Sequence, residues 1–410
     1  MSGTMATNAK HVIDFDHHSP VLRDNNTEVF KSLMYNEHGC PMGWSEHHGG
    51  FWAIWGYEAL YAAVQDWQTF SSGHSAECPK GVPSTNYIDP LIPIDYDGQI
   101  QQDFRKVVLN WFNPGHARGM QARIQQICDE LVNSFIERGE AELSYEMFTA
   151  MPAIVTLEML GWDSSRWREW VDWVHAMIHD GVLDPEGSME AVMNLYGSIN
   201  KEISDRRDHL GDDLFSDMMR TPVNDRLLTD DELRNFALLV LLGGMDTTAG
   251  VTGNSLLLID KDPALRQQLI DNVDQMPKII EEFLRIAGPG GGLYRRVTAD
   301  TEFFGEQLKE GEKVLMMFWA ASRDPKAFPD PEKIDIFREE NRHMAFGLGP
   351  HRCLGSHHAR MMLSTMMTAI FTRFADFQVQ WDGVERFEDC GSVYAVRHLP
   401  VTFTPGTRLV

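Results

Sequence analysis

The chain has 410 residues, of which 43% are hydrophobic and 23% charged, and its formal net charge is −24 at pH 7. This composition is typical of a globular protein with a large apolar core, whereas a disordered chain would carry fewer apolar residues. The strong negative charge repels phosphate backbones and anionic lipid, so we expect neither nucleic acid nor a membrane surface as a partner.

The start of the sequence and its cysteines exclude further classes. Residues 1–14 are polar and contain no apolar run of the kind found in secretory signals or membrane anchors, so a cytoplasmic protein is expected. No break in composition divides the chain, and we expect one domain over 1–410, with roughly 1–20 as an N-terminal tail. The 5 cysteines are scattered and lack Cys-x-x-Cys pairing, so they predict neither a disulfide framework nor a zinc site.

The expected secondary structure is mainly helical. A short strand around 51–54 precedes a helix from about 57 to 65. Longer helical patterns cover 105–138 and 165–180, and proline and glycine interrupt them, as at residues 113–115, Asn-Pro-Gly.

The best delimited helix begins after Thr229. Residues 229–232, Thr-Asp-Asp-Glu, have the spacing of a capping box, and Leu228 with Leu233 can form a hydrophobic staple. We expect this helix to run to about residue 260.

The last third of the chain mixes helices with strands. Pro277 can open a helix at its first turn. Residues 297–317 alternate around Gly305 and a Lys-Glu-Gly turn at 309–311, and 393–403 look similar. The expected fold class is therefore mainly α with a smaller β region.

Residues 346–355, Phe-Gly-Leu-Gly-Pro-His-Arg-Cys-Leu-Gly, place Cys353 in a glycine-rich loop just before a helix. Free N–H groups and the helix dipole at such a position favour a thiolate. Glycines let the backbone turn tightly and approach a flat group closely, as a cysteine ligand to haem iron requires. The alternative is a buried structural cysteine.

Residues 243–248, Gly-Gly-Met-Asp-Thr-Thr, lie within the expected long helix, where each glycine costs about 1 kcal/mol relative to alanine. Val240, Gly243, Gly244 and Thr247 share one face, so a notch without side chains lies against the threonine hydroxyl. The notch could admit a diatomic ligand and water. The alternative is a glycine that permits close helix packing, with Thr247 bonded back to a carbonyl.

Together these two segments resemble the cytochrome P450 family. The cysteine run matches the haem-binding pattern Phe-Gly-x-Gly-x-His-x-Cys-x-Gly at every fixed position, and residues 243–248 resemble the oxygen-activation motif. The resemblance implies the cytochrome P450 fold, with a long central helix over the haem and the cysteine-ligand loop beneath. It implies haem b (iron protoporphyrin IX) with Cys353 as the iron ligand. Thr247 would hydrogen-bond dioxygen and organise water, and Asp246 would pass protons.

The resemblance also assigns residues outside these two motifs. It implies cofactor contacts, including the propionates, from Gln101, Arg105, Arg295, His351, Gly243 and Phe346. It implies a substrate pocket lined by Tyr87, Leu91, Val240, Gly243, Gly244, Leu293, Val393 and Tyr394. Bare spacing favours a solvated ion pair for Glu282 and Arg285, whereas the resemblance implies a buried structural set of Glu282, Arg285 and Arg338.

The expected function is therefore that of a haem-thiolate monooxygenase, and the sequence looks similar to bacterial enzymes that hydroxylate camphor and cineole. The pocket residues predict a small, neutral, apolar, terpenoid-like substrate. Electrons would come from a ferredoxin and its reductase, docking near Arg352, Arg105 and Lys106. The alternatives are a non-catalytic haem sensor or hydrophobic-ligand-binding protein, and a peroxide-using haem enzyme.

Overall fold

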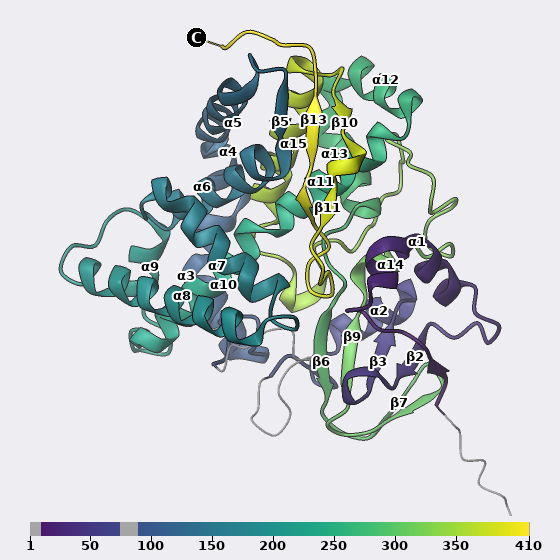
Figure 1. Ribbon diagram of the computed structural model, residues 1–410. Coiled ribbons are helices and arrows are strands. Elements are labelled where there is room, and N and C mark those ends of the chain that lie inside the picture. The colour runs from purple at the N-terminus through teal and green to yellow at the C-terminus, as the bar shows by residue number, and fades with distance from the viewer. Residues whose placement is uncertain (1–9, 74–88, 410) are drawn as a thin grey trace, which may run out of the picture.

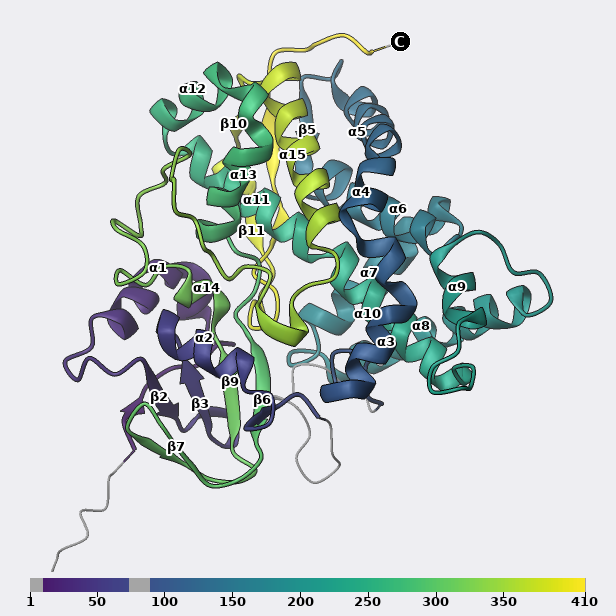
Figure 2. The ribbon, with the colours of Figure 1, turned by 180° about the vertical axis from the view of Figure 1, so that it is seen from behind.

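The computed structural model describes residues 10–73 and 89–409. Most of the helices lie on one side of the molecule, and the larger sheet lies on the other side together with α1, α2 and α14 (Figures 1 and 2). The fold class predicted from the sequence, mainly α with a smaller β region, is confirmed. The helices are α1 (Pro20–Met34), α2 (Tyr57–Gln65), α3 (Gly98–Phe112), α4 (Pro114–Gly119), α5 (Gln121–Phe135), α6 (Ala150–Met159), α7 (Trp167–His179), α8 (Pro185–Arg206), α9 (Leu214–Arg220), α10 (Asp230–Met245), α11 (Thr247–Asp260), α12 (Pro263–Asp271), α13 (Met276–Ile286), α14 (Phe318–Ala321) and α15 (Ser356–Arg373).

The strands form one larger sheet and smaller ones. The larger sheet has the order β1-β2-β3-β9-β6-β4, and a second sheet has the order β10-β13-β5. Within the larger sheet, β1 is parallel to β2 and β3 is parallel to β9, while the other neighbours are antiparallel. The strands are β1 (Val12–Ile13), β2 (Met42–Ser45), β3 (Phe51–Ile54), β4 (Phe70–Ser71), β5 (Glu140–Glu142), β6 (Leu293–Val297), β7 (Thr301–Phe303), β8 (Glu306–Leu308), β9 (Lys313–Met316), β10 (Gln378–Val379), β11 (Glu385–Arg386), β12 (Val396–His398) and β13 (Pro400–Thr402).

The segment before residue 20 takes part in the sheet. Val12 pairs with Trp44 of β2, and Phe15 and His17, which follow in the chain, are buried. The larger sheet therefore includes a strand from the region predicted as an N-terminal tail.

Helix α10 begins as the sequence predicts. The Thr229 hydroxyl accepts from the backbone N–H of Glu232, and the Glu232 carboxylate accepts from the Thr229 N–H, so both bonds of the capping box are present. The expected single helix to residue 260 is instead interrupted at Asp246, where φ is −106° and ψ is −37°, and α11 continues from Thr247.

Helices α10 and α11 form the centre of the helical part. Over Asp230–Asp260 they are long and apolar enough to cross a membrane, the one such case in the part of the chain that the structure describes, but 67% of the most apolar stretch is buried inside the protein. Burial of this kind is what the core helix of a globular protein shows.

Candidate functional site

The loop that carries Cys353 is closed by its own backbone. The Cys353 N–H donates to the Phe346 carbonyl at 2.8 Å. Gly347 and Gly349 adopt φ values of +62° and +66°, a left-handed conformation that glycine enters without strain. A Cβ at Gly349 would lie 2.7 Å from the Val64 carbonyl oxygen of α2, so only glycine lets the loop pack this closely on α2.

Helix α3 holds the same loop from a second side. Gln101 donates from Nε2 to the Pro350 carbonyl, and Arg105 donates from Nη2 to the Arg352 carbonyl, each at 2.8 Å. The two residues are four apart and therefore share a helix face. The buried Gln101 Oε1 has no partner within residues 10–73 and 89–409. The sequence-predicted cofactor residues Gln101 and Arg105 thus lie directly against the cysteine loop.

Among the described cysteines, Cys353 is exposed, while Cys128 and Cys390 are buried and Cys40 is half-buried. Cys353 is exposed as a residue, although the surrounding protein desolvates its thiol. Burial raises the pKa of its thiol, while the Gly355 N–H and the nearby arginines act to lower it. Burial raises the pKa of Cys128 to about 12 and that of Cys390 to about 11, so both are inert thiols. The accessible position of Cys353 does not fit a purely structural cysteine.

Asp97 lies beside two of the predicted propionate contacts. His351 Nε2 lies 2.9 Å from Asp97 Oδ1, and the same carboxylate accepts from the Ser71 hydroxyl at 2.6 Å. Burial acts to raise the pKa of Asp97, but hydrogen bonds from His351 and Ser71 outweigh it and leave the pKa lowered. Arg295 of β6 is buried, and its desolvation lowers its pKa to about 10 against the attraction of Asp97. Asp97 was not among the predicted site residues.

One face of α10 and α11 is less buried than the rest. Val240 and Thr247 are half-buried and Gly243 is exposed, although most of their neighbours are buried. A Cβ at Gly243 would meet no atom within 4 Å, whereas one at Gly244 would lie 2.5 Å from the Thr156 hydroxyl of α6. Thr247 donates to the Gly243 carbonyl at 3.0 Å. Both interpretations of the motif therefore have support. Gly243 faces open space, as a notch for a diatomic ligand requires, and Gly244 permits close packing of α10 on α6.

Asp246 is buried and lies against two histidines of α7. Its Oδ2 is 2.9 Å from His179 Nε2, and its Oδ1 is 3.4 Å from His175 Nε2. Burial acts to raise the pKa of Asp246, but the charge and hydrogen bond of His179, together with the nearby His175, lower it well below its usual range. Burial acts to lower the pKa of His179, and Asp246 raises it overall.

His179 is fixed on its other sides as well. Its Nδ1 lies 3.0 Å from the Asp389 carbonyl oxygen, and its ring stacks on Phe387 with centroids 3.7 Å apart. His175 and His179 were not predicted as functional. Their spacing of four residues on an expected helix was the available signal, because such residues share one face.

The predicted pocket residues differ in their burial. Leu91, Val393 and Tyr394 are buried, whereas Leu293, at the start of β6, is 42% exposed. The Tyr394 hydroxyl accepts from Asn26 and donates to the Arg23 carbonyl, so it is directed at α1. Tyr87 lies outside the described residues.

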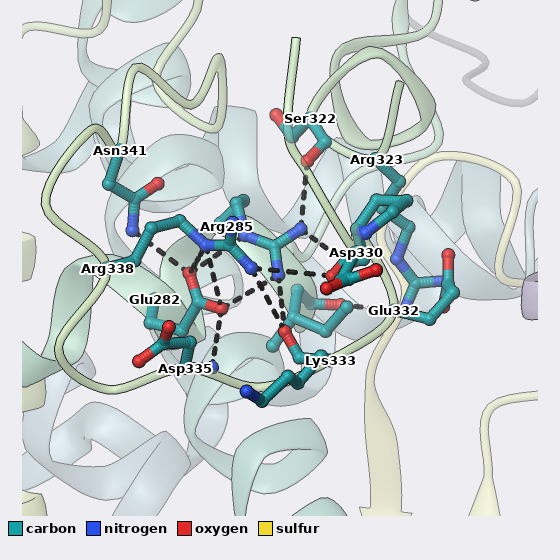
Figure 3. A network of polar contacts seen from close by, with 12 residues as sticks. Glu282, Arg285, Ser322, Arg323, Asp330, Glu332, Lys333, Asp335, Arg338 and Asn341 are labelled. Atoms are coloured by element: carbon teal, nitrogen blue, oxygen red, sulfur yellow. Dashed lines mark hydrogen bonds and ion pairs between the residues drawn. The ribbon is translucent and has the colours of Figure 1, made fainter. Parts of the chain in front are cut away.

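Glu282, Arg285 and Arg338 meet in the interior (Figure 3). Arg285 and Glu282 form a bidentate pair, with both nitrogen–oxygen distances at 2.8 Å, and Arg338 approaches the same carboxylate at 3.2 Å. The Arg285 side chain is 0% exposed and that of Glu282 is 2% exposed. Bare spacing favoured a solvated pair, and the geometry instead matches the buried set that the family resemblance implied.

These residues fit a haem in their chemistry. An accessible thiol, a buried arginine on β6 and a helix face without a side chain at Gly243 are the groups that such a cofactor would contact. In both views the loop before α15 lies at the centre of the molecule, between the helical part and β6 (Figures 1 and 2).

Known proteins resemble the chain in sequence and in fold. The cytochrome P450 family profile matches residues 275–398. The steroid C26-monooxygenase of Mycobacterium tuberculosis H37Rv is 32% identical, over 78% of this chain and 82% of that protein. Cytochrome P450 CYP107DY1 of Priestia megaterium is also 32% identical, over 73% of each. The structure of CYP109Q5 from Chondromyces apiculatus is 26% identical, covers 96% of this chain and 99% of its own, and has a TM-score of 0.83.

The sequence relatives cover more than two thirds of the chain, and the structural relative shares nearly its whole length. The family implies a haem cofactor, and its named members incorporate oxygen into their substrates. The chain belongs to the cytochrome P450 family of bacterial monooxygenases.

Proposed function

We propose that this cytochrome P450 hydroxylates a small, neutral, apolar, terpenoid-like compound, using dioxygen and electrons from a ferredoxin and its reductase. The observation that carries the proposal is the accessible Cys353, in a loop held from two sides by α2 and α3. We assign Cys353 as the ligand of haem b. A haem bound there supplies the chemistry that activates dioxygen.

The proposed proton pathway uses Asp246 and Thr247. The Thr247 hydroxyl donates to the Gly243 carbonyl, so its oxygen lone pairs are left to accept a hydrogen bond at the open face of the helix. Asp246 is held ionised by His179, whose raised pKa keeps a proton one hydrogen bond away. The Asp246 carboxylate can take the proton of His179 and pass it forward, and the histidine is then reprotonated from behind.

The proposed substrate class rests on the character of the lining. Leu91, Val240, Leu293 and Val393 are aliphatic, and burial of apolar area contributes about 25 cal/mol per Å² to binding. Beside Leu91, Asp89 forms an ion pair with Arg234 of α10 at 3.2 Å, so the arginine charge is already matched. The relatives named for steroid oxidation act on another neutral apolar class, which supports this polarity.

The proposed ferredoxin surface surrounds Arg352 and Lys106. Arg352 is exposed. Burial lowers the pKa of the neighbouring His357, and the positive charges of Arg352, Arg360 and Arg118 lower it further. Arg105 donates to the Arg352 carbonyl, so a second positive charge lies next to Arg352. This local positive charge on a strongly acidic chain suits an acidic ferredoxin. We place the enzyme in the cytoplasm, where such partners are found.

The test is reconstituted turnover. The haem protein is combined with a ferredoxin, its reductase and reduced nicotinamide, and monoterpenoids, ionone-like ketones and branched esters are screened for a haem spin-state change. A hydroxylated product with label from ¹⁸O₂ is the expected result. Binding without turnover would indicate a sensor, and turnover driven only by peroxide would indicate a peroxide-using enzyme; either outcome contradicts the proposal.

The ligand assignment has a separate test. The reduced carbon monoxide complex of the wild type should show a far red-shifted Soret band. Cys353→His should lose that band, while Cys40→Ala, at a half-buried cysteine elsewhere, should keep it. A wild-type band at the position typical of histidine ligation would show that Cys353 is not the iron ligand.

A further inference from the structure

Three histidines gather at the edge of the larger sheet, outside the site described above. His17 and His18 follow β1, and His48 lies in the turn between β2 and β3. One ring nitrogen from each lies within 4.8 Å of the ring nitrogens of the other two. The ring centroids of His17 and His18 are 3.9 Å apart, and His48 lies 5.4 Å and 5.1 Å from them. Ligand nitrogens at about 2.1 Å from zinc lie no more than about 4.2 Å apart, so a bound ion would draw the three rings slightly together.

Each of these imidazoles has an oxygen partner. His18 Nδ1 lies 2.8 Å from Asp389 Oδ1, and His48 Nε2 lies 2.7 Å from Asp16 Oδ1. His17 Nε2 lies 2.8 Å from the Tyr294 hydroxyl. Histidines that bind metals characteristically donate their second ring N–H to a carboxylate or another oxygen, which orients the ring and raises its basicity.

The Nε2 atom of His18 is the strongest indication that a ligand binds here. The His18 side chain is 5% exposed, and its Nε2 is buried with no hydrogen-bond partner among the residues that the structure describes. A buried polar atom without a partner costs about 1–3 kcal/mol, so it needs an explanation. A metal ion bound at Nε2 would provide one, because Nδ1 is already occupied by Asp389.

The backbone also suits a ligand set. His48 has a φ of +53°, a left-handed conformation that is uncommon for a residue with a side chain. Lys313 opposes a cation, while the carboxylates of Asp16 and Asp389 favour one.

We propose that His17, His18 and His48 form a site for a divalent transition metal, with Zn²⁺ as its occupant and water completing the coordination. Three neutral imidazoles with no thiolate suit Zn²⁺, whereas Mg²⁺ and Ca²⁺ prefer oxygen ligands. The cysteine pattern predicts no zinc site, and this one uses no cysteine.

The test is equilibrium dialysis of the haem-loaded protein against Zn²⁺ at neutral pH, with zinc and haem iron measured together. Wild type should retain one zinc per chain. His18→Ala and His48→Asn should weaken zinc binding by more than the about 10- to 100-fold that loss of a supporting contact costs, and Asp389→Asn should fall within that range. His47→Gln is the matched control, because His47 adjoins His48 but is exposed and pairs with Asp14.

Two results would overturn the site. One is a wild type that retains no more zinc than His18→Ala, and the other is a His47→Gln variant that loses zinc as severely as His48→Asn. Haem content and far-UV circular dichroism establish that each variant is folded. His48→Asn keeps the test decisive if His18→Ala fails to fold, since the His48 side chain is 24% exposed and tolerates change better.

Discussion

Replacing Arg285 with methionine should strongly destabilise the protein. The guanidinium donates to both oxygens of Glu282 and also to the carbonyl oxygens of Ser322, Pro331 and Lys333, at 2.7 to 3.2 Å (Figure 3). Methionine fills much of the volume but donates no hydrogen bond. The Glu282 carboxylate would remain buried, with Arg338, Asn341 and the Asp335 N–H as its remaining partners.

The expected loss follows from these contacts. Removing one partner of a buried ion pair costs about 3–5 kcal/mol, because the other charge remains in the interior. The three carbonyl groups that also lose a donor place the expected loss toward the upper end of that range. Arg338 limits the damage, since it still approaches Glu282 at 3.2 Å.

Urea unfolding of the haem-loaded protein measures the effect, followed by far-UV circular dichroism and by the Soret band. Arg166→Met is the matched control, because Arg166 and Glu169 have the same three-residue spacing but are 39% and 46% exposed. An exposed pair of this kind contributes less than about 1 kcal/mol. Equal losses in the two variants would refute the buried geometry of the Glu282 set.

Further predictions concern the proton pathway and the docking surface. Thr247→Ala should keep haem content and substrate affinity but release hydrogen peroxide in place of product, as an oxygen electrode with a peroxide assay would show; unchanged coupling would count against the assignment. Asp246→Asn should slow turnover by about 10²-fold or more with less leakage, measured as product formed per electron consumed. The raised pKa of His179 stabilises the fold below about pH 6.5, and this contribution is lost as pH rises through the folded-state pKa. The lowered pKa of Asp246 stabilises the fold above about pH 4, and this contribution is lost in acid. Asp246→Asn should therefore abolish the loss of unfolding free energy at higher pH, and because burial then lowers the pKa of His179, the variant should lose stability as pH falls below about 6.5. Arg352→Glu should slow reduction by ferredoxin without changing substrate affinity, and wild-type reduction should slow with added salt; a flat salt response in stopped-flow traces would exclude a charged docking surface.

Local features of the fold were predictable from the sequence because they depend on neighbours in the chain. The strand 51–54 and the helix 57–65 have the predicted bounds, and the capping box at Thr229 is present with both of its hydrogen bonds. The interruption at Asp246 was not predictable from helical periodicity. Its carboxylate is engaged by a different helix, and periodicity carries no information about contacts between helices.

In the candidate site too, features that depend on adjacent residues were predictable and contacts between distant residues were not. The cysteine loop has a dense local pattern, so its glycines and its closing hydrogen bond follow from adjacent residues. His179 lies 67 positions from Asp246, and Asp97 lies 254 positions from His351. A single histidine or aspartate on a helix or in a loop has too many possible neighbours for its partner to be inferred, so these contacts required the tertiary structure.

Asp389 connects the histidine cluster of His17, His18 and His48 with His179, so ligand binding at one can be linked to protonation of the other. Its carbonyl oxygen contacts His179, the partner of Asp246 at the break between α10 and α11, while its carboxylate contacts His18 near β1. Any ligand of His18 that moves Asp389 must change the proton affinity of His179, and protonation of His179 must change the affinity of that ligand by the same factor. The pKa of His179, followed by NMR with and without zinc, and the zinc affinity recorded across pH should therefore yield the same coupling constant.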